Sequence, residues 1–202
     1  GTSMATPHIA GLVAVLREYY RTHNINNPSA ALIKATLINS AREIGYGTPS
    51  NAAGWGRVDL STVFPGKKEV IAKDEATGLA SGQSINCRIN NVGGNAQFKA
   101  TLVWSDTPAV IPSIKNIVND LDLVITDPQG NVYKGNDFTA PFDNARDDTN
   151  NVEQIIIPSA MSGGYGLKVT GTNVPIPNQG YALVITYDKA SINGQVPMVC
   201  RP

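Results

Sequence analysis

The sequence has no excess of charge of either sign, few aromatic residues and no long apolar run. Its 202 residues include 16 Lys and Arg against 16 Asp and Glu, so the formal net charge is zero. Without a net basic charge, no overall field draws the chain to nucleic acid or to an anionic membrane. No stretch approaches the roughly 18 apolar residues of a spanning helix, and the first residues do not read as a signal peptide. Partners must therefore be inferred from local sites.

Cysteine is scarce, and the sequence leaves the pairing of its two cysteines open. Cys87 and Cys200 can form one disulfide in an oxidising compartment. They can equally be two unrelated thiols, one buried in a strand and one in a tail. The 42% of hydrophobic residues is enough for a sizeable core.

Residues 1–66 carry a helical pattern of apolar residues. The spacing predicts a helix over residues 3–20 that is buried, because its apolar stripe is flanked by small residues. A second helix is predicted over 29–43, after the start signals Pro28 and Ser29. The stripe of the first helix consists of Ile9, Leu12, Val13, Leu16 and Tyr20.

From about residue 68 the apolar period changes to two, and short runs alternate with Gly, Pro and Asn turns. The pattern predicts an all-β domain over 67–188, a sandwich or jelly roll of about eight strands. The boundary falls near residues 64–68, which read as a linker, and residues 189–202 read as a tail. The fold class predicted for the whole chain is α+β.

The first residues, GTSMATPHIAG, place Ser3 at the start of the predicted first helix. A serine hydroxyl becomes a nucleophile only when a base takes its proton and donors stabilise the oxyanion. The unpaired N–H groups of a helix N-terminus supply part of that need. The alternative is that Ser3 only caps the helix, as serine often does.

The longer motif favours Ser3 as a nucleophile over Ser3 as a helix cap. GTSMATPHIAG resembles the nucleophile motif of subtilases, the subtilisin-like serine proteases (peptidase family S8). ALIKATLINSA at 31–41 resembles the next helix of that family, and GWGRVDL at 54–60 resembles the segment that closes the catalytic domain. LVWSD, NDLDLVI and GNDF in the second half resemble the C-terminal β-barrel of the oxidatively stable alkaline protease branch. The match covers roughly residues 1–187.

The resemblance implies a secreted or extracytoplasmic serine endopeptidase acting on protein or peptide, with Ser3 as nucleophile. It also implies that residues 1–66 are the C-terminal helical portion of a subtilase α/β domain. In the subtilase order Asp and His precede Ser, and the oxyanion Asn precedes it too. His8 matches a motif histidine that is not catalytic, and His23 lies in a polar loop. The chain is therefore expected to be a C-terminal fragment, inactive alone, whose partner is the missing N-terminal part of the catalytic domain.

The β half contains a group of aspartates that predicts a calcium site. If the hairpin turn places residue 127 opposite 130, Asp137 lies opposite Asp120, and Asp122 shares their face. Facing carboxylates need a cation between them, and calcium takes six to eight oxygens. The resemblance also implies calcium in this barrel. The following loop adds further candidate ligands, which are Asp143, Asp147 and Asp148.

Other functions stay open at this level. The β half can be the functional part, as a calcium-dependent module that binds a polysaccharide or another protein, with the subtilase remnant as scaffold. The chain can also be an inactive homologue kept for interaction, against which the intact Ser3 argues.

Overall fold

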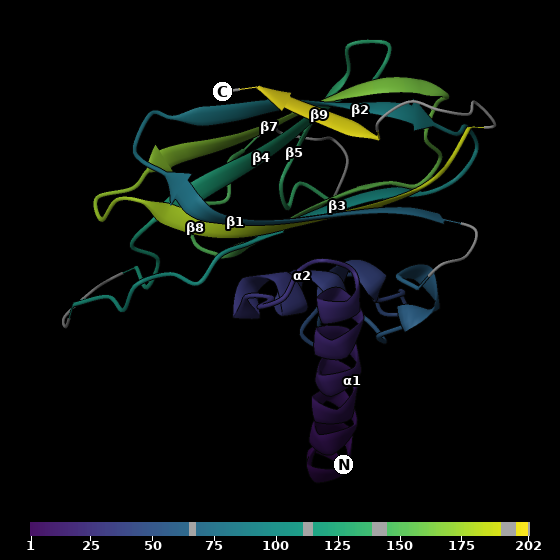
Figure 1. Ribbon diagram of the computed structural model, residues 1–202, viewed down its shortest axis with the longest axis vertical. Coiled ribbons are helices and arrows are strands. Elements are labelled where there is room, and N and C mark those ends of the chain that lie inside the picture. Colours follow the sequence, from purple (N-terminus) through teal and green to yellow (C-terminus); the bar gives the residue numbers. More distant parts are fainter. Residues whose placement is uncertain (65–67, 111–114, 139–144, 191–196, 202) are drawn as a thin grey trace.

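The computed structural model describes residues 1–64, 68–110, 115–138, 145–190 and 197–201. In this part of the chain a helical segment lies against one face of a two-layered β structure, and the first helix projects away from it (Figure 1). Of the predicted linker at 64–68, residues 65–67 lie outside the described residues. The helical segment consists of α1 (Thr2–Thr22), α2 (Ala30–Ser40) and the short 3-10 helix η1 (Leu60–Thr62).

The β structure consists of two antiparallel sheets. The four-stranded sheet has the order β1-β8-β3-β6, and the five-stranded sheet has the order β5-β4-β7-β2-β9. The coarse α+β prediction is confirmed by this arrangement. The strands are β1 (Lys68–Leu79), β2 (Ser84–Val92), β3 (Phe98–Val103), β4 (Asp120–Thr126), β5 (Val132–Lys134), β6 (Val152–Ile157), β7 (Gly163–Asn173), β8 (Gln179–Asp188) and β9 (Met198–Arg201).

Alternation along the strands produces the core between the two sheets. In β4, Leu121 and Leu123 are fully buried and point into this core, as their period of two predicts. Trp104 follows β3, is 1% exposed, and donates its indole N–H to the carbonyl of Asn119 at 2.8 Å. Phe98 stacks on Tyr165 with ring centroids 5.0 Å apart. Trp104, Phe98 and Tyr165 therefore act as core anchors of the β half.

The structure differs from the predicted tail in its last residues. Residues 198–201 form β9, which pairs with β2 in the register Cys87 opposite Cys200. These two cysteines form a disulfide. The weak pattern of the tail hid this strand, because β9 lies at a sheet edge and alternates between half-buried and exposed side chains.

The predicted hairpin register is wrong by one residue. The N–H of Asp127 bonds to the carbonyl of Asn131 at 3.0 Å, and the paired strands run from Thr126 opposite Val132. The side chain of Asp127 accepts from the N–H groups of Gln129 and Asn131, and Gly130 takes φ of +89°. The loop therefore holds one more residue than the tight turn that the Pro-Gln-Gly pattern predicts.

The second helix is joined to the four-stranded sheet by a buried polar side chain. Asn39 donates its amide to the hydroxyl of Thr101 and the carbonyl of Val184, both at 3.0 Å, and accepts from the hydroxyl of Thr186 at 2.9 Å. Asn39 is 2% exposed. One amide on α2 thus fixes the position of the helix relative to β3 and β8.

Two further contacts hold the ends of α2 on the same sheet. At its start, Asp74 of β1 accepts from the N–H of Ser29 at 2.7 Å and from its hydroxyl at 2.6 Å. At its end, buried Lys99 of β3 donates its ammonium to the carbonyl of Ala41 at 2.6 Å. Carboxylates at a helix start and cations at its end both favour the helix dipole. The helical segment and the sheet therefore pack as one unit.

Within the described residues, no helix combines the length and the apolar character that a membrane crossing requires.

Candidate functional site

Ser3 lies in the first turn of α1 and is exposed to solvent. It does not cap the helix, because the N-cap position is Gly1 and no side chain caps this end. The first intrahelical bonds are donated by the N–H groups of Met4 and Ala5 to the carbonyl of Gly1. The N–H of Ser3 therefore belongs to the group that has no acceptor inside the helix, and it points outward as an oxyanion donor must.

The two histidines do not lie where a general base must lie. The ring of His8 hydrogen-bonds through Nδ1 to the carbonyl of Met4 at 2.6 Å, on another face of the same helix. His23 caps the far end of α1 and bonds through Nδ1 to the carbonyl of Tyr19 at 2.7 Å. At 1.5 Å of rise per residue, His23 lies about 30 Å from Ser3. In the described residues Ser3 therefore has no histidine positioned to take its proton.

The prediction that α1 is buried along its length is wrong in this chain. Only Leu16 and Tyr20 are buried, and both lie in the second half of the helix. The hydroxyl of Tyr20 bonds to that of Thr36 on α2 at 2.7 Å. Met4, 66% exposed, and Ile9, 39% exposed, belong to the first half, which projects away from the rest of the molecule (Figure 1). The apolar pattern of the first half has no partner among the described residues, which explains the difference.

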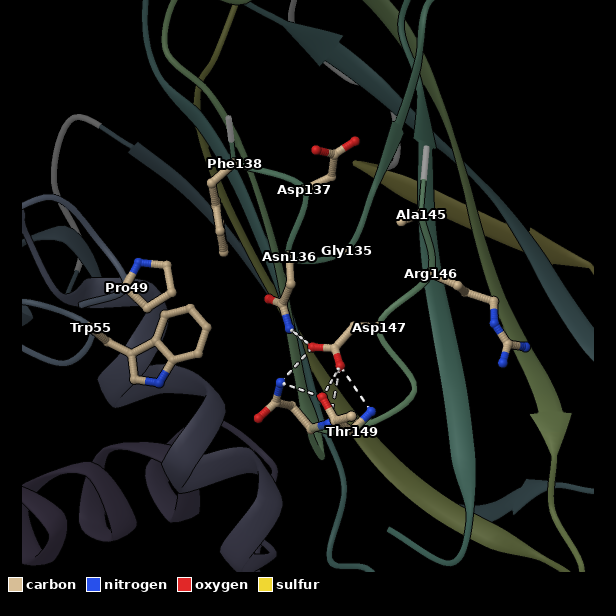
Figure 2. Close-up of a pocket in the computed structure, with 11 residues that line it drawn as sticks. Pro49, Trp55, Gly135, Asn136, Asp137, Phe138, Ala145, Arg146, Asp147 and Thr149 are labelled. Carbon is tan, nitrogen blue, oxygen red and sulfur yellow. Dashed lines mark hydrogen bonds between the residues drawn. The ribbon is translucent and has the colours of Figure 1, made fainter. Parts of the chain in front are cut away.

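A cavity of about 630 Å³ opens between the helical segment and the β domain (Figure 2). Trp55 and Phe138 form one wall, with ring centroids 6.2 Å apart in an edge-to-face arrangement. The opposite wall carries Asp147, whose two oxygens accept from the N–H and side-chain groups of its own loop. Trp55 is thus only partly buried and lines this cavity.

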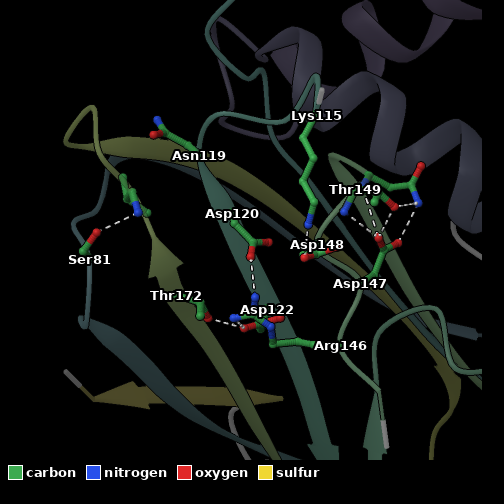
Figure 3. A network of polar contacts seen from close by, with 12 residues as sticks. Ser81, Lys115, Asn119, Asp120, Asp122, Arg146, Asp147, Asp148, Thr149 and Thr172 are labelled. Atoms are coloured by element: carbon green, nitrogen blue, oxygen red, sulfur yellow. Dashed lines mark hydrogen bonds and ion pairs between the residues drawn. The ribbon is translucent and has the colours of Figure 1, made fainter. Parts of the chain in front are cut away.

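The structure brings Asp120 and Asp122 together, as predicted, on the face of β4 opposite the core leucines. Both are paired with Arg146, whose Nη2 lies 3.0 Å from Oδ2 of Asp120 and whose Nη1 lies 3.4 Å from Oδ2 of Asp122 (Figure 3). The hydroxyl of Thr172 on β7 also donates to Oδ2 of Asp122. Oδ1 of each aspartate is buried without a hydrogen-bond partner.

The other predicted calcium ligands do not join this pair in a common contact. Asp147 is held in its own loop, where both carboxylate oxygens accept hydrogen bonds, one of them from Asn136. Asp148 pairs with Lys115 (Figure 3). Asp137 follows β5, which ends at Lys134, and so is not opposite Asp120 in a strand. Asp143 lies outside the described residues. Among the described residues, no group of three or more His, Cys, Asp or Glu side chains is arranged to hold a metal ion.

Glu153 lies close to Asp120 and Asp122, and the three residues together are called the acidic face; the sequence pattern did not predict that Glu153 belongs to it. Glu153 of β6 is 1% exposed, and its Oε2 accepts from the N–H of Leu123 at 2.5 Å. Burial raises the pKa of this carboxyl well above its usual range. Burial, and then the neighbouring Asp122, also raise the pKa of Asp120 to about 6, although Arg146 opposes the rise. A glutamate inside the apolar run NVEQIIIP is the only sequence signal for Glu153.

Comparison with known proteins shows that the chain is similar to serine proteases, and the family match lies in the helical segment. A model of the subtilase family (Peptidase S8) matches residues 1–56. The serine protease/ABC transporter B family protein tagA of Dictyostelium discoideum is 32% identical over 209 residues, covering 92% of this chain and 12% of that protein. The serine protease/ABC transporter B family protein tagD of the same organism is 28% identical over 274 residues, covering 100% of this chain and 15% of that protein.

A third relative is bacterial. The extracellular serine protease of Serratia marcescens is 37% identical over 75 residues, covering 37% of this chain and 7% of that protein. The chain therefore spans only a small part of each of these relatives. Among solved structures, a Bacillus licheniformis lipase in propeptide form aligns with a TM-score of 0.36 and 11% sequence identity. The alignment covers 59% of this chain and 22% of the lipase chain, and this similarity is too low to support a shared fold or function. The family match and the relatives' names support a protease at the level of the family.

Proposed function

We propose that the chain is the nucleophile-bearing part of a subtilisin-like serine endopeptidase, in which Ser3 forms the acyl-enzyme. One observation carries the proposal: the subtilase family model matches residues 1–56, and Ser3 of the matched motif lies exposed in the first turn of α1. Its hydroxyl oxygen would attack the carbonyl carbon of a peptide bond, the amine would leave, and water would then release the acyl group. The N–H of Ser3 would stabilise the oxyanion formed in each step.

The base and its orienting carboxylate would have to come from a polypeptide outside these 202 residues. The described surroundings of Ser3 support this, because His8 and His23 are both committed to backbone carbonyls of their own helix. In subtilisin, loss of the base costs on the order of 10⁶ in kcat, about as much as loss of the serine. The chain alone would therefore be inactive.

The exposed first half of α1 supports the same proposal. Met4 and Ile9 are exposed apolar side chains on a helix whose sequence pattern is that of a buried one. The upstream part of the catalytic domain is the partner that we propose for this surface. The second half of α1 is held on α2 by the hydrogen bond between Tyr20 and Thr36, so this contact does not depend on the proposed partner.

The β domain would serve as the scaffold that carries the nucleophile helix. Its strand order, β1-β8-β3-β6 against β5-β4-β7-β2 with β9 added at the edge, supports a jelly roll. The contacts of Asn39, Asp74 and Lys99 support the scaffold role, because they fix α2, on which α1 rests. The detailed resemblance to the oxidatively stable alkaline protease branch is part of this proposal.

Covalent labelling by a fluorophosphonate tests the proposal directly. The chain is mixed with the upstream polypeptide of its own precursor, and the labelled peptide is identified by mass spectrometry. We expect label on Ser3, none after Ser3→Ala, and none on the chain alone. Ser61→Ala is the matched control, because Ser61 is also exposed and donates its hydroxyl to a carboxylate, Asp59, at 2.7 Å. Absence of a Ser3 adduct in the complete mixture would overturn the proposal.

An oxidising, extracytoplasmic location is part of the proposal. The disulfide between Cys87 and Cys200 supports it, because such bonds persist outside reducing compartments. The name of the Serratia relative points the same way. Labelling of free thiols in protein taken directly from cells tests it: we expect no free thiol.

Calcium in the β domain stays a prediction. The unpartnered Oδ1 atoms of Asp120 and Asp122 favour a cation at this face. Arg146 opposes it, because its guanidinium already contacts both side chains. A calcium ion is also opposed by the other partners of Asp147 and Asp148, which are Asn136 and Lys115. Thermal unfolding in EDTA and in calcium chloride decides between a bound cation and the Arg146 contact.

A second candidate function, binding of a polysaccharide by the β domain, is favoured by one observation. Trp55 and Phe138 line the open cavity of Figure 2, and exposed aromatic faces are typical of sugar sites. Affinity electrophoresis in gels containing soluble polysaccharides tests it. Retardation that disappears in Phe138→Ala would support this function, and equal mobility in all gels would exclude it.

A further inference from the structure

Two aspartates share one largely buried face of β4 and so require a positive charge. The side chain of Asp120 is 5% exposed and that of Asp122 is 13% exposed. Adjacent carboxylates of this kind repel each other, and burial strengthens the repulsion because water no longer screens it. The leucines on the other side of β4 and the hydrogen bonds between strands carry no positive charge, so they cannot neutralise the two carboxylates.

Arg146 supplies that charge with the geometry of a bridging ion. One terminal nitrogen of its guanidinium faces Asp120 at 3.0 Å, and the other faces Asp122 at 3.4 Å. A planar guanidinium keeps its two nitrogens in a fixed fork, so a single side chain neutralises both carboxylates at once. Figure 3 shows Arg146 reaching both aspartates, while Lys115 is directed to Asp148.

The remaining acidic side chains do not complete a metal site around this pair. Asp147 accepts hydrogen bonds on both oxygens from its own loop and from Asn136. Glu153 holds the N–H of Leu123 through Oε2 and is buried. A calcium ion would need six to eight oxygens, and the two aspartates that remain are already bridged. The described residues therefore do not fit a bound calcium in their present arrangement.

We propose that the guanidinium of Arg146 is the resident cation of this face, so that the β domain needs no calcium there. The face becomes a divalent-cation site only when the guanidinium is removed. Asp120 and Asp122 then offer up to four carboxylate oxygens, two of them without any present hydrogen bond, and the Thr172 hydroxyl lies beside them. Arg146 is 40% exposed, so a hydrated ion can reach the position from solvent.

The test measures thermal unfolding of the full chain in EDTA and in calcium chloride at matched ionic strength. We expect the wild-type midpoint to differ by less than about 1 °C between the two conditions. Arg146→Met keeps most of the apolar stem and removes the charge, so its midpoint in EDTA is expected to fall by about 3–10 °C. Calcium is expected to restore most of that loss in a saturable way. Arg146→Lys is expected to fall less and to respond little to calcium.

Two controls keep the proposal open to refutation. Lys115→Met removes a neighbouring cation that pairs with Asp148 and not with Asp120 or Asp122, and it is expected to show no calcium response. The double variant Arg146→Met/Asp122→Asn removes one carboxylate charge, so it is expected to fold without calcium and to lose the response. Isothermal titration of the wild type with calcium is expected to give no heat of specific binding. A calcium-dependent wild-type midpoint, or Arg146→Met without a calcium response, would overturn the proposal. Either result leaves the labelling of Ser3 unaffected, because the two experiments use different sites.

Discussion

Substitution of Asn39 by Leu or Ala tests whether the helical segment and the β domain are one folding unit. Asn39 is 2% exposed and its amide exchanges three hydrogen bonds of 3.0 Å or less with Thr101, Val184 and Thr186. After substitution these buried partners lose a donor or an acceptor and cannot reach water. Each buried polar group left unsatisfied costs about 1–3 kcal/mol. We therefore expect the free energy of unfolding to fall by about 3–5 kcal/mol, the Ala variant also leaving a small cavity.

The measurement is equilibrium unfolding in urea, followed both by far-ultraviolet circular dichroism and by tryptophan fluorescence. The wild type is expected to unfold in a single transition seen equally by both probes, because α2 and the sheet share buried contacts. Ser40→Ala is the matched control. Ser40 is the next residue and is equally buried, but its hydroxyl donates only to the carbonyl of Leu37 in its own helix, at 2.9 Å. Its loss is expected to cost less than about 1.5 kcal/mol.

Two results would refute this reasoning. One is a cost at Asn39 no greater than that at Ser40, which would mean that the amide contributes little to docking. The other is a wild-type chain that unfolds in two separate transitions, which would mean that the helical segment opens while the β domain stays folded.

Further predictions concern a buried ammonium, the disulfide and the nucleophile helix. Burial lowers the pKa of Lys99 to about 8, so between about pH 8 and pH 10.5 the unfolded chain binds more protons, and stability is expected to rise with pH by about 2–3 kcal/mol. Lys99→Met should abolish this rise in urea unfolding measured across that range, and an unchanged slope would contradict it. The bond between Cys87 and Cys200 closes a loop of 113 residues, so Cys200→Ser is expected to lower the free energy of unfolding by about 4 kcal/mol. A loss below about 1 kcal/mol would show that β9 contributes nothing through this link. Limited proteolysis is expected to cut the first half of α1 before Leu16, since that half is exposed, and protection there in the isolated chain would contradict the structure.

Much of the fold was predictable because it depends on local patterns. The period of two in DLDLVITD and GYALVITYD predicts β4 and β8, and the period of 3.6 predicts α1 and α2, with ends shifted by a few residues. The edge strand β9 and the hairpin register were not predictable. The first has too few apolar residues to leave a pattern, and the second depends on how Asp127 accepts from the N–H groups beyond it.

The candidate site divides in the same way. The motif around Ser3 predicts a nucleophile at a helix start, and the structure adds that Gly1, not Ser3, occupies the cap position. The acidic residues of the β half were visible in the sequence, but their partners were not. Arg146 and Glu153 come from segments well separated from Asp120 and Asp122 along the chain, so no spacing rule connects them.

The sequence by itself determined the order of elements, the change from helices to strands and the identity of the nucleophile motif, because each is set by neighbours within a few residues. Only the tertiary structure decided which charges meet, whether the two cysteines pair and which part of α1 is covered. These depend on contacts between residues tens to more than a hundred positions apart, as between Asn39 and Thr186, and such contacts form only when the two sheets and the helix have packed. The electrostatics of the acidic face follow from the same packing, because burial gives its charges their strength.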